Sequence, residues 1–188
     1  MHPDKEQLES GLHGESTQSG SPIDAYPFRL DAVVLAGTHQ NPNRLIMGRN
    51  KAFLELGGQE LIRYVVDALV KAETIDQVFV VGPAGELMEK LADFPACVHV
   101  IAQRGKMLTN CWAGIEASED RHRNDPEISV KERPLLIISC DLPLVTARSI
   151  DDFVRRCANE DRKAEGPYAM LAGVVDEPGV KPFHPSNN

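Results

Sequence analysis

The chain has 188 residues, of which 42% are hydrophobic, and its formal net charge is -8 at pH 7. A chain of this length supports one well-buried domain rather than two. The acidic balance argues against a nucleic-acid partner, because such binding depends on many Lys and Arg residues that neutralise phosphates. Any recognition of phosphate must therefore be local.

The cysteines and the hydropathy pattern predict the cellular compartment of the protein. The four cysteines lie far apart, without a C-x-x-C pair or a nearby His at zinc-site spacing, so we expect buried thiols in a reducing cytoplasm. No stretch approaches the roughly 18 to 20 apolar residues that cross a bilayer. The N-terminus also lacks the apolar region of a signal peptide. We expect a cytoplasmic protein with no membrane partner.

Composition divides the chain into three parts. Residues 1–27 are rich in Ser, Gly, Glu and Gln without apolar periodicity, which predicts a disordered tail. Residues 28–175 carry the apolar patterns and form the expected domain. Residues 176–188 are Pro-rich and are expected to be an irregular tail.

Strands and helices are predicted to alternate along the domain. Short apolar runs predict strands, and apolar residues at helical spacing predict helices. Thr146 is the expected N-cap of the last helix. The predicted strands lie within 31–37, 77–82, 97–102 and 134–144, with 168–175 as a possible further strand, and the predicted helices lie within 60–73, 84–93, 107–118 and 146–160. Such alternation predicts an α/β fold, with a mainly parallel sheet between two helical layers.

A cationic loop follows the first predicted strand. Gly37 ends that strand, and the loop after it carries Arg44, Arg49 and Lys51 without any acidic residue. Backbone N–H groups of such a loop can surround phosphate oxygens while the cations neutralise their charge. The alternative is a solvated surface loop, but long loops without secondary structure are usually functional. We therefore favour phosphate binding, with Lys51 as the main candidate.

Asp141 follows the last buried strand of the domain. In open α/β sheets, ligands bind outside the carboxyl ends of the strands, and a carboxylate there can hold Mg²⁺. A strand-end turn residue explains the same position equally well. The presence of the cationic loop favours the metal site.

A third connection, residues 102–110, links a strand directly to a helix. Thr109 and Asn110 lie in the first turn of that helix, where they can reach a base or ribose, although capping of the helix is the simpler interpretation. Trp112 is expected in the core rather than as a cofactor platform. The sequence contains no P-loop, no dinucleotide-binding glycine motif and no nucleophile elbow.

Two stretches together carry a family resemblance. The run LAG followed by MGRNKAFLELGG, with PLLIISCDLPL further along, resembles the MobA-like nucleotidyltransferases, which have a glycosyltransferase-A-like fold. Their first loop has the form L-A-G-G-x-S-x-R-M-G-x-D-K. The resemblance extends over roughly residues 31–158. The residues that match the two ends of the loop are Leu35, Ala36, Gly37, Met47, Gly48 and Lys51.

The resemblance implies an enzyme that takes an NTP as substrate and Mg²⁺ as cofactor. A phosphate or hydroxyl acceptor would attack the α-phosphate, and pyrophosphate would leave. Lys51 and Arg44 would stabilise the developing charge, and Asp141 would hold the metal. The nucleotide-binding residues would be Leu35, Ala36, Gly37, Arg49, Lys51, Thr109 and Asn110.

The chain departs from the family pattern in its loop and at its C-terminus. Thr38 stands where the second glycine is usual, Asn50 replaces the usual aspartate, and a longer loop leaves Arg44 out of register. The family's second metal-binding aspartate and much of its acceptor pocket come from segments beyond Asn188. We therefore expect a C-terminally truncated member.

Two alternatives to a nucleotidyltransferase follow from these departures. The first is a non-catalytic nucleotide-binding or regulatory remnant that kept the fold. The second is a glycosyltransferase of the same fold, which usually has a D-x-D metal motif that CDLPL lacks. The acceptor and the oligomeric state are left open by the sequence.

Overall fold

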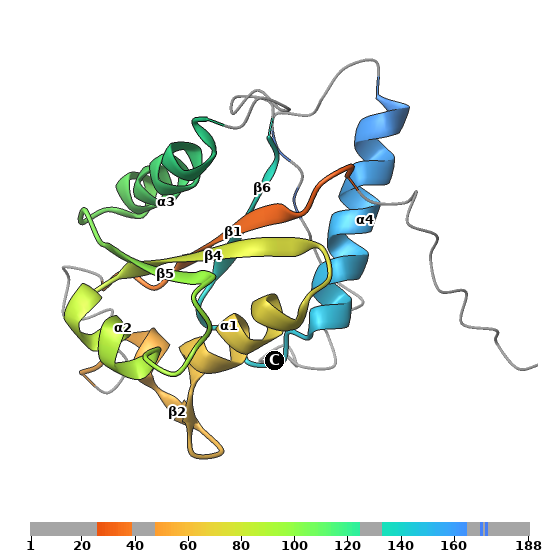
Figure 1. Cartoon of the computed structure of the whole chain (residues 1–188). Helices are drawn as coiled ribbons and strands as arrows, with labels where there is room; N and C mark the ends of the chain where they lie inside the picture. Colours follow the sequence, from red (N-terminus) through yellow and green to blue (C-terminus); the bar gives the residue numbers. More distant parts are fainter. Residues whose placement is uncertain (1–25, 39–47, 125–132, 165–169, 171, 173–188) are drawn as a thin grey trace, which may run out of the picture.

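The computed structural model describes residues 26–38, 48–124 and 133–164, together with Met170 and Ala172. Almost all of the predicted tails, and the possible strand over 168–175 apart from Met170 and Ala172, lie outside these residues and stay predictions. Within the described part, a parallel sheet is covered by helices on both faces (Figure 1). The predicted α/β class is confirmed.

The sheet has four parallel strands in the order β5-β4-β1-β6. They are β1 (Leu30–Leu35), β4 (Ile75–Gly82), β5 (Val98–Ala102) and β6 (Leu135–Ser139). β1 is central, because Val33 pairs with Phe79 on one side and with Ile137 on the other. The two inner strands are almost entirely buried, as their continuous apolar sequences predict.

Alternate residues of β1 contribute to two separate apolar layers. Ala32 and Val34 belong to the larger core, into which α1 (Leu61–Lys71), α2 (Ala84–Lys90) and α4 (Ala147–Lys163) pack. Val33 belongs to the smaller core beneath α3 (Met107–His122). The predicted cap of α4 is confirmed, since the Thr146 side chain accepts a hydrogen bond from the Ser149 N–H.

The link between β1 and α1, residues 36–60, is partly regular where it is described. A single 3-10 turn, η3 (Lys51–Phe53), precedes a small hairpin of β2 (Glu55–Leu56) and β3 (Gln59–Glu60). Gly57 and Gly58 form the turn with φ angles of 62° and 85°, a backbone region that favours glycine.

Two expectations about buried side chains are wrong. Trp112 is 60% exposed rather than in the core, because α3 turns its small residues, among them Ala113 and Gly114, towards the sheet. Of the four cysteines only Cys140 is buried, whereas Cys97, Cys111 and Cys157 are half-buried and all four are free thiols. Within the described residues, no helix combines the length and the apolar character needed to span a membrane.

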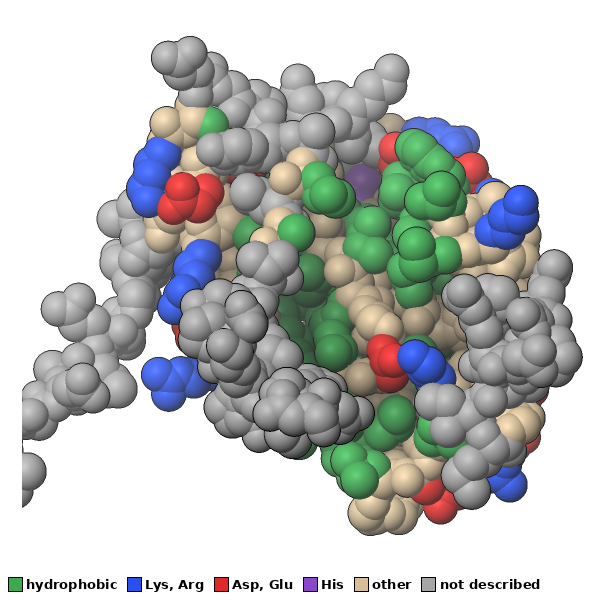
Figure 2. Space-filling model, turned by 180° about the vertical axis from the view of Figure 1, so that it is seen from behind, with side chains coloured by type: hydrophobic (Ala, Val, Ile, Leu, Met, Phe, Trp, Pro, Cys, Tyr) green, Lys and Arg blue, Asp and Glu red, His purple; other side chains and the backbone are tan. Residues whose placement is uncertain are grey.

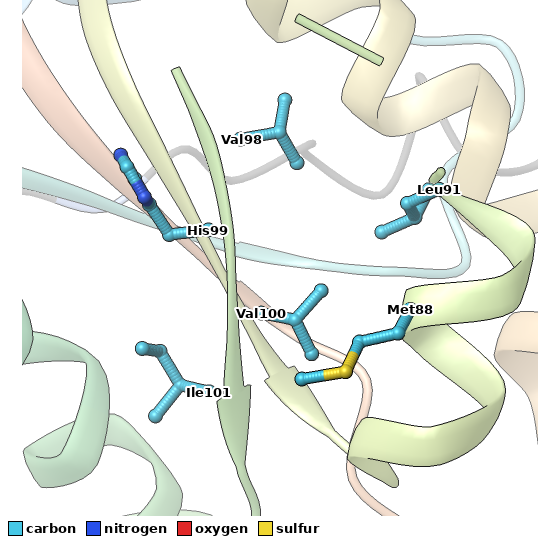
Figure 3. Close-up of a pocket in the computed structure, with 6 residues that line it drawn as sticks. All are labelled: Met88, Leu91, Val98, His99, Val100 and Ile101. Carbon is cyan, nitrogen blue, oxygen red and sulfur yellow. The ribbon is translucent and has the colours of Figure 1, made fainter. Parts of the chain in front are cut away.

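Among the described residues, the rear face and the edge strand β5 are two of the places where apolar side chains reach the surface. Figure 2 shows hydrophobic side chains gathered on the rear face of the molecule, and the exposed large ones on α3 and β6 are Met107, Leu108, Trp112 and Ile137. A groove of about 450 Å³ follows β5, the edge strand of the sheet. In Figure 3, Val98 and Val100 point to the same side of β5 as Leu91 and Met88, and His99 and Ile101 to the other.

Candidate functional site

The candidate site lies where β1 and β6 end side by side. Leu35 and Ser139, the last residues of the two strands, are paired. The Cys140 N–H continues this pairing by donating to the Leu35 carbonyl at 3.3 Å. Because Cys140 is also buried, the chain leaves the sheet at a fixed point, and Asp141 emerges directly beside the end of β1.

Lys51 reaches Asp141 from the turn that follows the cationic loop. The turn η3 that contains Lys51 is anchored by the buried Ala52 and Phe53. Lys51 Nζ donates to Asp141 Oδ2 at 3.1 Å, although the two residues are 90 positions apart in the chain. Their side chains are 51% and 30% exposed. The two main candidates from the sequence thus meet at a place that a ligand can reach.

The surroundings of Asp141 stabilise its carboxylate in the ionised form. The Ser139 hydroxyl donates to Asp141 Oδ1. That hydroxyl, and after it the Lys51 ammonium, hold the pKa of the Asp141 carboxyl below its ordinary value despite the partial burial that raises it. The group is therefore ionised at neutral pH, which is the state that accepts hydrogen bonds from cations or binds a metal ion.

Asn50 holds the start of η3 against the end of β1. Its Nδ2 donates to the Ala36 carbonyl at 2.8 Å and to Thr38 Oγ1 at 3.1 Å. Its Oδ1 accepts from the Ala52 N–H at 3.1 Å. The two residues by which the loop departs from the family pattern, Thr38 and Asn50, are therefore hydrogen-bonded to each other.

The connection between β5 and α3 also contacts the end of β1. Gln103 Oε1 accepts from the Thr38 N–H at 2.7 Å. Asn110, which is buried, accepts from the Arg104 N–H at 2.7 Å through Oδ1. A Cβ atom added to Gly37 would lie 2.4 Å from Asn110 Nδ2. Any larger residue at this position would therefore displace the Asn110 side chain.

The other predicted site residues are dispersed around this centre. Leu35 and Ala36 supply backbone groups at the end of β1. Thr109 caps α3, because its Oγ1 accepts from the Lys106 N–H at 3.1 Å, so the capping interpretation is confirmed. Arg104 is paired with Glu116 at 2.5 Å. Arg44 lies outside the described residues.

Arg49 lines a pocket of about 380 Å³ to which Thr38 and Asn50 also contribute. Glu55, Glu60 and Glu86 also line it, and Glu60 is paired with Lys90 at 3.0 Å. With three carboxylates against two cations, this pocket is poorly suited to a triphosphate. The pocket adjoins the Lys51 and Asp141 site through Asn50, but neither Lys51 nor Asp141 lines it.

Two contributing residues escaped the sequence prediction. Ser139 and Gln103 are polar residues at the ends of β6 and β5. The rule that identified Asp141, a polar residue at a strand end, applies to both of them. They were missed because neither carries a charge.

The donor set for a metal ion is limited. Among the described residues, no group of three or more His, Cys, Asp or Glu side chains is placed to hold one. Asp141 offers one carboxylate, whose two oxygens already accept bonds from Ser139 and Lys51. One carboxylate completed by substrate phosphates and water is an ordinary arrangement for Mg²⁺. The residues present fit that ion only together with a phosphate ligand.

A parallel sheet of this strand order is shared by several doubly wound α/β folds. The structure of 4-diphosphocytidyl-2C-methyl-D-erythritol synthase from Anaerococcus prevotii matches 85% of this chain and 64% of its own with a TM-score of 0.53, at 13% identity. The sequence-family model described as MobA-like NTP transferase domain matches residues 32–178 of this chain. The chain therefore belongs to the MobA-like NTP transferase family.

Two further proteins are similar to the chain. The bifunctional protein GlmU from Sorangium cellulosum is 30% identical over 153 residues, which are 81% of this chain but only 30% of that protein. A nucleotidyl transferase from Methanothermobacter thermautotroptrophicus has a TM-score of 0.49 at 24% identity, covering 70% of this chain and 57% of its own. The chain thus spans less than a third of the curated relative that it matches.

Proposed function

We propose that the protein transfers a nucleotidyl group from an NTP to a phosphate or hydroxyl acceptor and releases pyrophosphate. The observation that carries this proposal is the contact between Lys51 Nζ and Asp141 Oδ2 at the carboxyl edge of the sheet. Membership of the MobA-like NTP transferase family supports an NTP as the substrate. The acceptor has no assigned residue.

In this proposal Lys51 and Asp141 act on the same triphosphate. Lys51 exchanges its ion pair with Asp141 for phosphate oxygens and stabilises the negative charge that develops on the leaving pyrophosphate. Asp141, ionised and oriented by Ser139, would hold Mg²⁺, and the ion would neutralise charge on the phosphates. Gly37 lets the end of β1 lie against Asn110, and Arg44 remains the second proposed cation.

A non-catalytic nucleotide-binding protein is the second candidate, and one observation favours it. The Thr38 N–H, which stands at the position of a phosphate-binding loop amide, already donates to Gln103 Oε1 at 2.7 Å. An amide that is engaged in this way cannot also donate fully to a phosphate oxygen. Such a protein would bind a nucleotide without turnover.

The test is calorimetric titration of each of the four NTPs into the full chain with and without Mg²⁺, followed by a pyrophosphate-release assay with an acceptor pool. Lys51→Met and Asp141→Asn are the test variants. Lys71→Met and Asp67→Asn are matched controls, because they break an ion pair of 2.7 Å on the exposed face of α1.

Each outcome separates the candidates. Release of pyrophosphate that depends on Mg²⁺ and is lost in Lys51→Met and Asp141→Asn, but not in the two controls, supports the transferase. Tight NTP binding without release supports the non-catalytic protein. Unchanged turnover in both test variants, or transfer of sugar from a nucleotide sugar, overturns the proposal.

A further inference from the structure

The orientation of the Asn50 side chain is fixed by its own partners. The Ala52 N–H can only donate, so Oδ1 must face it, and the Ala36 carbonyl can only accept, so Nδ2 must face that. The second hydrogen of Nδ2 then meets Thr38 Oγ1. Asn50 uses both donor hydrogens and its acceptor, and no other residue of the same size offers this combination.

These bonds determine where Lys51 stands. Asn50 directly precedes Lys51, and its Oδ1 caps the turn that contains Lys51 while its Nδ2 is tied to the end of β1. Asp141 leaves the sheet beside the same strand end. A half-exposed ion pair does not by itself hold a flexible lysine in one geometry. The hydrogen bonds of Asn50 with Ala36, Thr38 and Ala52, which we call the brace, therefore position Lys51 beside Asp141.

Thr38 supplies the remaining hydrogen-bond partner of Asn50. Its Oγ1 receives the second Asn50 hydrogen, and its N–H is held by Gln103 Oε1. A glycine at position 38 would leave that hydrogen without its acceptor. An aspartate at position 50 would place a carboxylate against the Ala36 carbonyl, where only a donor is tolerated. The side chains at positions 38 and 50 are therefore matched to each other.

We propose that Asn50 is a positioning residue that sets Lys51 beside Asp141, and that Thr38 is its matched partner. The consequence for turnover rests on the proposed function, since Lys51 must act on the triphosphate. The positioning itself is a property of the chain without a ligand. Asn50 touches neither substrate nor metal in this scheme and acts through Lys51.

The test for positioning is zero-length cross-linking of the full chain with a water-soluble carbodiimide. The reagent activates the Asp141 carboxylate, the Lys51 amine displaces the urea by-product, and an amide joins the two peptides. The Lys71 and Asp67 pair, with Nζ and Oδ2 2.7 Å apart, provides an internal standard in every digest. Mass spectrometry then gives the ratio of the two cross-links.

The variants test the hydrogen bond that Asn50 accepts from Ala52 separately from the two that it donates to Ala36 and Thr38. Asn50→Ser keeps an oxygen for the Ala52 N–H but loses the amide NH₂ group that reaches Ala36 and Thr38. Thr38→Val removes the acceptor at nearly constant shape, and Thr38→Ser restores it. We expect Asn50→Ser to lower the cross-link ratio about threefold to tenfold, the equilibrium value of one hydrogen bond. Thr38→Val should lower it less, Thr38→Ser should match the natural chain, and Asn50→Ser with Thr38→Val should equal Asn50→Ser alone.

A ratio in Asn50→Ser equal to that of the natural chain would overturn the proposal, as would an additive loss in the double variant. Because no nucleotide is used, this result stands even if the chain never releases pyrophosphate. Where turnover is present, Asn50→Ser should lower kcat more than it raises KM, because Lys51 stabilises charge that develops during the reaction. A change confined to KM would contradict the positioning of Lys51.

Discussion

Gly114 of α3 lies directly against Val33 of β1. A methyl group added at Gly114 would be 2.4 Å from Val33 Cγ1 and 2.8 Å from Cγ2. Val33 is fully buried in the centre of the sheet and cannot retreat. The glycine therefore sets the distance at which α3 packs on the sheet, and α3 in turn brings Asn110 to Gly37.

Gly114→Ala should destabilise the protein by about 1 to 3 kcal/mol, because overpacking a well-filled core forces backbone shifts. Urea unfolding followed by circular dichroism measures this change. Gly85→Ala on α2 is the matched control, since a Cβ there meets nothing within 4 Å. That control should stabilise by about 0.5 to 1 kcal/mol, the cost of glycine in a helix. Equal stabilities of the two variants would contradict the close packing of α3.

The parallel strands and the shared edge of the candidate site residues follow from simple features of the sequence, whereas the strand order is given only by the structure. Continuous Val, Ile and Leu runs identify strands that are covered on both faces, as β1 and β4 are. Parallel strands bring their carboxyl ends to one edge. Lys51 and Asp141 could thus be predicted at the same edge, although only the structure gives their contact of 3.1 Å.

The bonding partners of the site residues could not be predicted. The Asn50 contact with Thr38 depends on the path of a loop, and loop geometry has no periodic signal in sequence. The position of Trp112 was mispredicted for a different reason. An apolar residue in a helix is expected to face the core, but α3 packs through Gly114 and Ala113, so its largest side chain faces outwards.

Asp151 connects α4 to the turn before β4. Its Oδ1 accepts from the Thr74 N–H at 2.9 Å and from Thr74 Oγ1 at 2.7 Å, and its Oδ2 accepts from the Glu73 N–H at 3.2 Å. Asp151→Ala would leave these donors unsatisfied and should cost about 3 kcal/mol in unfolding free energy. The exposed neighbour Asp152 provides the control, and Asp152→Ala should change stability by less than about 0.5 kcal/mol. A similar small loss in both variants would show that water replaces Asp151.

Cys140 should be the least reactive of the four thiols in the folded protein. Burial, and after it the Asp141 carboxylate, raise the pKa of Cys140 to about 12, and the thiolate is the reactive form. Pulse labelling with iodoacetamide at pH 8, read by peptide mass, should modify the half-buried Cys97 well before Cys140. Labelling in denaturant should remove the difference. Equal labelling rates of Cys97 and Cys140 in the native protein would mean that the end of β6 opens readily.

His99 should make stability fall in acid. It lies on β5 with Nε2 2.9 Å from Gln77 Oε1 and its ring 5.0 Å from that of Phe79. Burial, and after it the positive charge of Arg121, lower the pKa of His99 below its ordinary 6.5, although Asp31 opposes the shift. Since the unfolded chain then binds the proton more readily, the contribution of His99 is complete above about pH 6.5 and is lost as the pH falls through the lower folded pKa.

The experiment compares the natural chain with His99→Gln, in which an amide can still bond to Gln77. Ionisable groups that do not interact with His99 are common to both proteins and cancel in the difference. Urea unfolding at pH 8 and pH 5 should show a stability gap between the two proteins that shifts against the natural chain at the lower pH. A gap that stays constant, or that shifts in favour of the natural chain in acid, would mean that His99 is not held neutral by burial between β5 and α3.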